Sequence, residues 1–140
     1  MITVNPIFIE EFLTPMVGGG DREEDKNVIR MSNCNLDHEG DSVVLIREFL
    51  LPSFNSLPDP IKIISKYTLA YYLYFNKIDF EDILSSIMAP VKYSKNVRPF
   101  FVKIWKEIFK EESYEYIKDL NVKEEFDIEA PLKLYKKIKQ

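Results

Sequence analysis

The stretch from Ile61 to Phe75, IKIISKYTLAYYLYF, decides the fold that this sequence predicts. Its first turns are amphipathic, because Lys62, Ser65 and Lys66 lie on one flank. From Leu69 to Phe75 every residue is aliphatic or aromatic, and a helix that is apolar on all sides has to be surrounded by other elements. We therefore expect a central helix over residues 61–75 against which the rest of the chain packs.

Three later segments have the spacing of amphipathic helices. They are residues 79–89, residues 96 or 97 to about 120, and residues 129 to about 138. Each places apolar residues three and four positions apart, so each offers one stripe to a core. Because these stripes need a common interior, we expect a mainly α fold, a single-domain helical bundle or array around the central helix.

The first 60 residues are less regular. Asn5 and Pro6 predict the start of a short helix that runs to about Leu13. Residues 28–31 have the composition of a short strand, whereas residues 42–51 are ambiguous between strand and helix, with a slight preference for helix. The fold class therefore includes the option of a small N-terminal β-hairpin that pairs residues 28–31 with residues 42–49. We expect a surface loop at residues 32–41 and an extended connection at residues 52–60.

Length and composition predict one folded domain. The chain has 140 residues, of which 46% are hydrophobic and 14% aromatic, and a disordered chain lacks the apolar area that this composition provides. We expect a single domain over residues 1–140. Within it, residues 1–52 form an acidic N-terminal part with flexible loops, and residues 60–140 form the helical core.

Cysteine usage and the longest apolar run predict the compartment. Cys34 is the only cysteine, so no intramolecular disulfide can form, and a reducing compartment fits best. The N-terminus lacks the basic region of a signal peptide. The longest apolar run, from Leu69 to Phe75, is far shorter than the roughly 20 residues of a membrane span. We expect a cytoplasmic protein with no membrane partner.

The charge argues against nucleic-acid binding. The net charge is −4 and the isoelectric point is about 5.1, whereas domains that neutralise phosphates carry a basic excess. Residues 1–60 hold eleven acidic and four basic side chains, a net of −7, and residues 61–140 hold twelve acidic and fifteen basic, a net of +3. The acidity is thus concentrated in the N-terminal part.

No motif for catalysis, a cofactor or a metal stands out. Cys34 and His38 are the one candidate nucleophile and base, but the residues between them supply no oxyanion donor, so a loop histidine beside a half-buried thiol is favoured. Asp37, Glu39, Asp41 and Glu48 match a calcium loop in part, with Ser42 at the position that requires glycine. We expect no enzyme activity, no cofactor and no metal.

The tyrosines of the central helix allow two interpretations. Tyr67, Tyr71, Tyr72, Tyr74 and Phe75 could line a pocket in which hydroxyl groups orient a ligand. Core packing is the favoured interpretation, because aromatic stripes at helical spacing fill the interior of small bundles and their hydroxyl groups find partners there.

The acidic loop segments are the best candidate for a binding site. Two such segments, DREEDKN and DHEGD, lie beside glycines, and together they predict a surface that attracts a basic protein partner and repels nucleic acid. The alternative for each segment alone is a charged loop that serves solubility. The predicted partner-binding residues are Asp21, Glu23, Glu24, Asp25, Asp37, Glu39 and Asp41.

In size, acidity, aromatic content and lack of active-site residues, the chain resembles bacterial immunity proteins of polymorphic or contact-dependent toxin systems. The resemblance is a profile over the whole chain, with DREEDKN and DHEGD as candidate toxin-facing segments. It implies a tight complex in which the protein neutralises a cognate toxin domain. The alternative is a regulatory or host-interaction adaptor of phage or viral type, and the third hypothesis is an enzyme with an unrecognised site.

Overall fold

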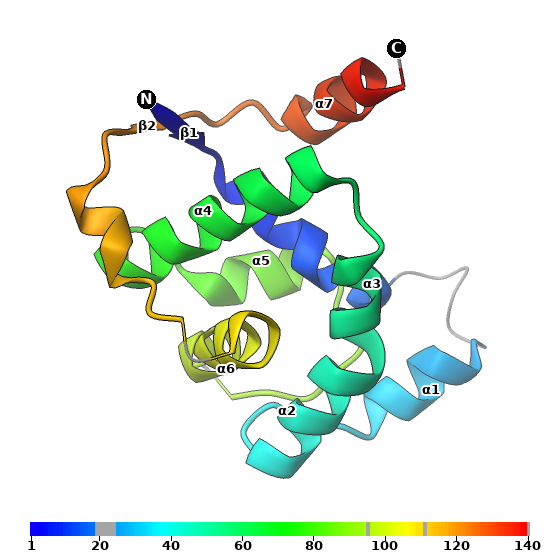
Figure 1. The fold of residues 1–140 in the computed structure, drawn as a ribbon. Helices are drawn as coiled ribbons and strands as arrows, with labels where there is room; N and C mark the ends of the chain where they lie inside the picture. Colours follow the sequence, from blue (N-terminus) through cyan, green and yellow to red (C-terminus); the bar gives the residue numbers. More distant parts are fainter. Residues whose placement is uncertain (19–24, 95, 111, 140) are drawn as a thin grey trace.

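A computed structural model of the chain describes residues 1–18, 25–94, 96–110 and 112–139. It is mainly helical, and the N-terminal strand pairs with a strand that precedes the last helix, in a two-stranded parallel sheet (Figure 1). The expected mainly α fold is therefore confirmed. The elements, in chain order, are β1 (Ile2–Val4), η1 (Pro6–Met16), α1 (Lys26–Ser32), α2 (Glu39–Leu45), η3 (Ile46–Leu50), α3 (Leu51–Asn55), α4 (Asp59–Phe75), α5 (Phe80–Ser86), α6 (Arg98–Phe109), η4 (Glu115–Asp119), β2 (Val122–Glu124) and α7 (Ala130–Ile138).

The central helix is α4, and it lies where the sequence predicts it. Pro60 occupies its first turn, and Asn76 ends it in the left-handed conformation with φ 52°. Helix α4 contacts η1, β1, η4, α6 and α7, which surround it on several sides (Figure 1). Residues 69–73 are buried, whereas Tyr74 and Phe75 are 37% and 41% exposed. The apolar run is thus enclosed over its first five residues only.

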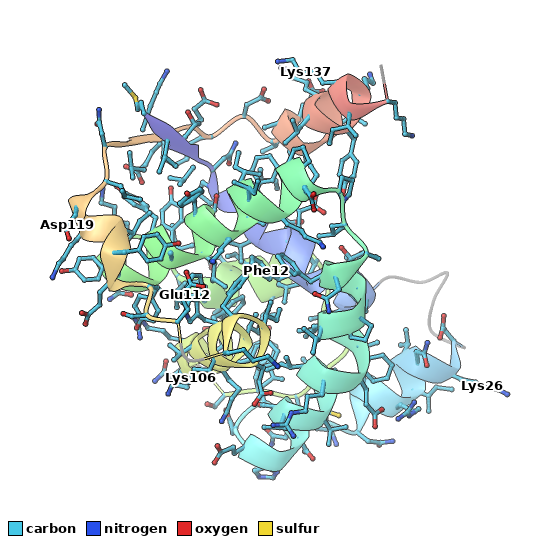
Figure 2. All side chains as sticks on the ribbon, viewed as in Figure 1. Phe12, Lys26, Lys106, Glu112, Asp119 and Lys137 are labelled. Carbon is cyan, nitrogen blue, oxygen red and sulfur yellow. The ribbon has the colours of Figure 1, made fainter. Side chains whose placement is uncertain are left out.

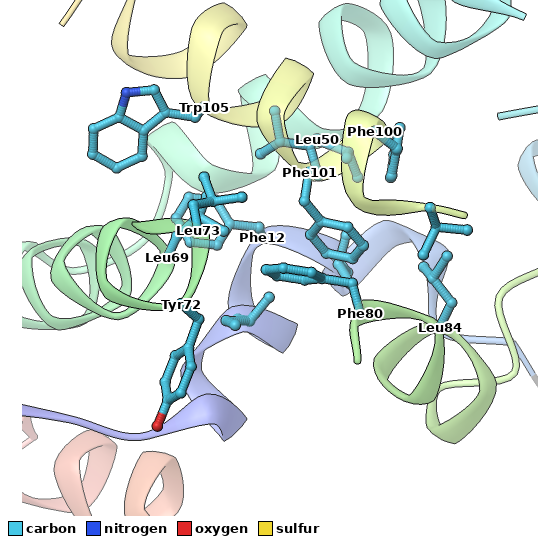
Figure 3. Packing of buried hydrophobic residues seen from close by; sticks show 14 of the residues in the cluster. Phe12, Leu50, Leu69, Tyr72, Leu73, Phe80, Leu84, Phe100, Phe101 and Trp105 are labelled. Atoms are coloured by element: carbon cyan, nitrogen blue, oxygen red, sulfur yellow. The ribbon is translucent and has the colours of Figure 1, made fainter. Parts of the chain in front are cut away.

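Aromatic rings connect α4 to the elements around it. Phe12 of η1 stacks on Phe54 of α3 at 4.7 Å, and Phe109 of α6 meets both rings edge-on at 6.1 and 5.6 Å. Phe80 of α5 stacks on Phe101 of α6 at 4.5 Å. Figure 3 shows Phe12 next to Leu69 and Leu73 of α4, with the stacked pair of Phe80 and Phe101 beside them. Offset and edge-on pairs of this kind add to the free energy of apolar burial.

The β-hairpin expected at the N-terminus is not present, because both of its strands are helical. Residues 28–31 lie in α1, where Asp25 caps the helix and Val28 and Met31 are buried at a spacing of three. Residues 42–49 lie in α2 and η3, which confirms the slight preference for helix in this segment. The β-branched residues gave a misleading strand signal, since packing overrides such propensities.

The extended connection expected at residues 52–60 begins later than predicted. Helix α3 includes Pro52 in its first turn and ends at Asn55. The preceding element η3 is a π-helix, in which the Leu51 amide donates to the Ile46 carbonyl. Because proline has no amide hydrogen and its ring displaces an earlier carbonyl, the wider turn lets the chain continue in helical form past Pro52.

The helix expected over residues 97–120 is wrong in length, because α6 ends at Phe109. Lys110 has φ 57° and ψ −130°, and the Glu112 amide donates to the Phe109 carbonyl across a turn. Trp105 donates from Nε1 to the Glu112 carbonyl at 2.6 Å, which fixes the turn against α6. The polar sequence KEES at residues 110–113 offers no apolar stripe, so burial does not favour a longer helix.

The parallel sheet was not predicted from the sequence. Ile2 pairs with Val122 and Val4 with Glu124, so residues at opposite ends of the chain lie side by side. The short helix after β1 is confirmed, although it is a 3-10 helix that continues to Met16. Asn5 caps this helix through its side chain, as expected, and is only 2% exposed.

Candidate functional site

The first predicted acidic segment is only partly described. Asp21, Glu23 and Glu24 lie outside the described residues. Asp25 lies at the start of α1, where its carboxylate accepts a hydrogen bond from the Asn27 amide at 2.8 Å. This residue therefore has a helix-capping role beside any role in binding.

The second acidic segment, residues 37–41, is exposed and held in place by neutral donors. The Ser94 amide and hydroxyl donate to the Asp37 carboxylate at 3.1 and 3.0 Å. The Asn35 amide donates to Asp41 Oδ2 at 3.0 Å. Because these donors carry no charge, the bonds position the two carboxylates without neutralising them.

Glu39 differs from its two acidic neighbours, because it forms an ion pair. Lys103 of α6 donates from Nζ to Glu39 Oε1 at 2.6 Å. The hydrogen bond and the charge of Lys103 lower the pKa of Glu39 below its usual value. Glu39 therefore contributes less net negative charge to this surface than Asp37 and Asp41 do.

The backbone around this segment is anchored to a distant part of the chain. The Leu36 amide donates to the Lys92 carbonyl at 2.8 Å, and the Lys92 amide donates to the Cys34 carbonyl at 3.0 Å. Leu36 is buried at 7% exposure. The two segments therefore fix each other. The surface loop expected at residues 32–41 is shorter in the structure, because Ser32 ends α1 and residues 39–41 begin α2, and the anchored segment does not support the flexible loop that the sequence predicts here. We call the residues Asp37, Glu39 and Asp41 the acidic loop surface.

A shallow hollow lies next to the acidic loop surface. Its volume is about 280 Å³, and α6 provides the opposite wall. It is lined by Leu36, Asp37, Glu39, Ser42, Pro99, Phe100 and Lys103. The sequence did not predict Ser94 and Lys103 as part of this site, since they lie 57 and 64 positions from their partners. No local signal in the sequence identifies such pairs.

Cys34 and His38 lack the features of a nucleophile and its base. The thiol points to the Arg30 carbonyl at 3.7 Å, and burial, together with Asp41, raises its pKa. A nucleophilic cysteine needs the opposite shift. His38 Nδ1 faces Asp41 at 3.7 Å, and this side chain is 71% exposed. The observed contacts fit a loop histidine and a partly buried thiol.

The carboxylates of the partial calcium pattern have separate partners. Glu48 pairs with Arg30 of α1, while Glu39 pairs with Lys103 and Asp37 with Ser94. Among the described residues, no three side chains of the metal-ligating types are grouped closely enough to hold an ion. Asp41 accepts from the Asn35 amide, so each of the four acidic residues has a different partner within the chain.

The tyrosines of α4 are divided between the core and the surface. Tyr71 and Tyr72 are buried, and each hydroxyl has a partner. Tyr72 donates to Glu124 of β2 at 2.9 Å, and Lys77 donates to the Tyr71 hydroxyl at 2.5 Å. Burial and the Glu124 carboxylate raise the pKa of Tyr72. The preference for core packing over a ligand pocket is confirmed for these two residues.

A larger hollow of about 730 Å³ lies elsewhere, at the turn after α6. It is open, and two of its polar lining residues, Trp105 and Glu112, are engaged in structural contacts. Trp105 donates to the Glu112 carbonyl, and the Glu112 carboxylate accepts from Lys66 at 2.8 Å. We find no convergent set of acid, base and nucleophile among its described lining residues.

Two further findings bear on the class of protein. In the part of the chain that the structure describes, no helix is both long enough and apolar enough to cross a bilayer. Comparison of the chain with protein-family models, with curated proteins and with solved structures finds no match. The fold and the surface contacts are therefore the basis for any functional proposal.

Proposed function

We propose that the protein binds a basic protein partner through the acidic loop surface. The observation that carries this proposal is the arrangement of Asp37, on the loop before α2, and Asp41, in the first turn of α2. Neutral donors hold both carboxylates, and the segment is anchored to residues 92–94. A binding loop that is already ordered loses little conformational entropy on association. Uncompensated carboxylates steer and orient a positively charged partner.

The finer proposal is that this partner is a toxin domain and that the protein is its immunity protein. The supporting features are the small size, the net charge of −4 and the aromatic content of 14%. An inhibitor of this kind needs a rigid, charged surface and no catalytic group of its own. The cytoplasm is the compartment that we propose, because the single thiol of Cys34 suits a reducing environment.

The test removes charge from the acidic loop surface and leaves its hydrogen bonds in place. In the double variant Asp37→Asn and Asp41→Asn, each amide oxygen still accepts the bond that the carboxylate accepts. The matched control is Glu115→Gln with Asp119→Asn, which removes the same charge from η4, at the left edge of the molecule and away from α2 (Figure 1). Tagged wild type, variant and control are used to capture partners from the source cell.

We expect wild type and control to retain one basic partner that the double variant loses. With the purified partner, the dissociation constant should rise roughly tenfold or more in the double variant and become less dependent on salt. For the finer proposal, expression of the partner alone should stop growth, and co-expression of the wild-type protein should restore it.

Two outcomes would contradict the proposal in different ways. A partner that binds the double variant as tightly as wild type places the binding surface elsewhere. A partner that has no toxicity rules out the immunity role and leaves the adaptor hypothesis.

Charge reversal of Glu23, Glu24 and Asp25, followed by the same measurement, tests the other predicted acidic segment.

A further inference from the structure

Helix α7 lies beside a hollow that its side chains do not fill. The hollow has a volume of about 330 Å³, and its walls come from β1, η1, α4, the connection after β2 and α7 itself. Phe8 of η1 and Ile64 of α4 line it on the side of the body, and Ala130 and Leu134 line it on the side of α7. We call this space the α7 hollow. Because protein interiors leave few gaps larger than a water molecule, α7 and the body are not closely packed here.

Helix α7 also buries little of its own surface. None of its residues, 130–138, is buried, whereas α6 buries Phe100, Phe101, Ile104 and Trp105. The main contacts of α7 are with α4 and η1, and Figure 1 shows the helix at one edge of the molecule. Buried apolar area is the main source of the free energy that docks a helix. Helix α7 is therefore held more weakly than α6.

A single side-chain hydrogen bond joins α7 directly to the body. The Tyr135 hydroxyl donates to Glu11 Oε2 of η1 at 3.1 Å. In the described part of the chain, no other side-chain hydrogen bond or ion pair runs from α7 to η1 or α4. The attachment of this helix thus depends on one polar contact and on a small apolar one.

The charged side chains around the α7 hollow do not tie the helix to the body either. Asp127 pairs with Lys133 at 2.7 Å, and Glu125 pairs with Lys123 at 3.8 Å, so both ion pairs lie within the C-terminal segment. Lys137 forms no ion pair with a described residue, and Figure 2 shows it at the outer edge of the molecule. Exposed ion pairs contribute little to stability.

The chain that leads to α7 is fixed as far as residue 127. The Glu125 amide donates to the Val4 carbonyl at 2.8 Å, and Asn5 donates from Nδ2 to the Asp127 carbonyl at 2.9 Å. Residues 128 and 129 then form a turn, in which Ile128 is 78% exposed. The segment from residue 128 onward can therefore leave the body without a change in the sheet or in α4.

We propose that α7 is a strap, which opens from the body as a unit and uncovers Phe8 and Ile64 while α4 and the core stay folded. Elements with few buried contacts open locally at a lower free-energy cost than global unfolding. An isolated helix of nine residues is marginal in water, so α7 loses its helical hydrogen bonds when it opens. The closed strap shields the apolar floor of the α7 hollow, and the open state presents it. This inference is independent of the acidic loop surface and of the proposed function.

The first experiment is amide hydrogen exchange of the full chain, resolved by residue with NMR. We expect the amides of residues 133–138 to share one protection factor, roughly 100-fold or more below that of residues 69–73 in α4. A shared factor is the signature of opening as a unit. Fraying from the end of the helix gives protection that falls steadily toward residue 138 instead.

The second experiment fills the α7 hollow from the side of the helix. Ala130→Met adds a flexible apolar side chain that can reach Phe8 and Ile64, so exchange of residues 133–138 should slow by roughly threefold or more. The matched control is Lys136→Met, at an exposed position outside the lining of the hollow, and it should leave the rate nearly unchanged.

The third experiment removes the bond between Tyr135 and Glu11. Tyr135→Phe should speed exchange of residues 133–138 by roughly threefold or more and leave residues 69–73 unchanged. The matched control is Tyr93→Phe, which removes a hydroxyl that lies between α5 and α6 and has no hydrogen bond to a described residue. It should not affect exchange in α7.

Three results would each overturn this inference. If residues 133–138 exchange no faster than residues 69–73, α7 opens only with the whole molecule. If their protection falls steadily toward residue 138, the helix frays and does not open as a unit. If Ala130→Met and Lys136→Met change the exchange rate equally, the α7 hollow has no part in holding the strap. Circular dichroism of each variant verifies that the fold is retained.

Discussion

Gly18 lies in a crowded site and Gly40 in an open one, and single substitutions can measure the difference. A Cβ atom at Gly18 would lie 1.9 Å from the Met88 carbonyl oxygen, whereas a Cβ at Gly40 meets nothing within 4 Å. The Gly18 amide also donates to the Ile87 carbonyl at 2.8 Å, so η1 and the end of α5 approach here through backbone atoms.

The same substitution should therefore have opposite effects at the two glycines. We expect Gly18→Ala to lower the free energy of unfolding by about 2 kcal/mol or more, because the backbone has to shift. Gly40→Ala lies in the first turn of α2 and should raise it by up to about 1 kcal/mol. Urea unfolding followed by circular dichroism measures both. A Gly18→Ala variant as stable as wild type would contradict the close approach.

At the scale of elements, α7 is attached to η1 through a partly buried carboxylate, and burial disfavours its charged form. The Tyr135 hydroxyl of α7 donates to Glu11 Oε2 of η1 at 3.1 Å. Burial raises the pKa of Glu11 above its ordinary 4.5, and the bond from Tyr135 opposes this shift. Burial and the Glu11 charge raise the pKa of Tyr135 to about 12.

The sign of the Glu11 shift predicts how stability depends on pH. The folded state binds the Glu11 proton more tightly than the unfolded state does. The contribution of Glu11 to the free energy of unfolding is therefore present below about pH 4.5 and is lost as the pH rises through the raised pKa. Glu11→Gln keeps an acceptor for Tyr135 and removes the charge. Its gain in unfolding free energy should be larger at pH 7 than at pH 4, as measured by urea unfolding at both values. An equal gain at both pH values would contradict the raised pKa.

At the scale of the whole molecule, Asn5 joins three distant segments. Its Oδ1 accepts from the Ile7 amide at 3.1 Å, its Nδ2 donates to the Asp127 carbonyl at 2.9 Å, and its backbone amide donates to Thr68 Oγ1 at 3.4 Å. The buried side chain of Asn5 therefore joins the N-terminal segment to the approach to α7, and its backbone amide joins that segment to α4.

Asn35 provides a matched control for Asn5. Its Oδ1 accepts from the amide two residues later, that of Asp37, at 2.9 Å, as Asn5 does with Ile7. Asn5→Ala should cost about 2–3 kcal/mol of unfolding free energy, from the lost cap and an unpaired carbonyl. Asn35→Ala should cost about 1 kcal/mol or less. Equal losses, measured by thermal and urea unfolding, would show that the bond to Asp127 adds nothing.

Local patterns predicted the elements whose signals lie within a few residues. The helix starts at Asn5 and at residue 79, the end of the central helix at residue 75 and the start of α7 near residue 129 all agree with the structure. Where the elements differ from the expectation, the deciding contact is remote or the turn is unusual. Helix α6 stops at a strained Lys110, and α3 passes Pro52 through a π-turn.

The candidate site, too, was only partly predictable from local sequence. The sequence identified Asp37, Glu39 and Asp41 as an acidic segment, and it had no means of showing that Ser94 and Lys103 hold two of them. It also placed the apolar residues of α7 in the core. Periodicity shows which residues share one face of a helix, but it does not show whether another element covers that face. In the structure Leu132 of that set is 56% exposed.

The sequence by itself determined a mainly α domain built around the helix of residues 61–75, because apolar periodicity and caps are encoded within a few residues. Only the tertiary structure decided that residues 2–4 pair with residues 122–124 as parallel strands and which carboxylates are neutralised. It also decided which apolar stripes stay exposed. These features depend on which residues, distant in sequence, meet when the core is packed, and no local pattern encodes that.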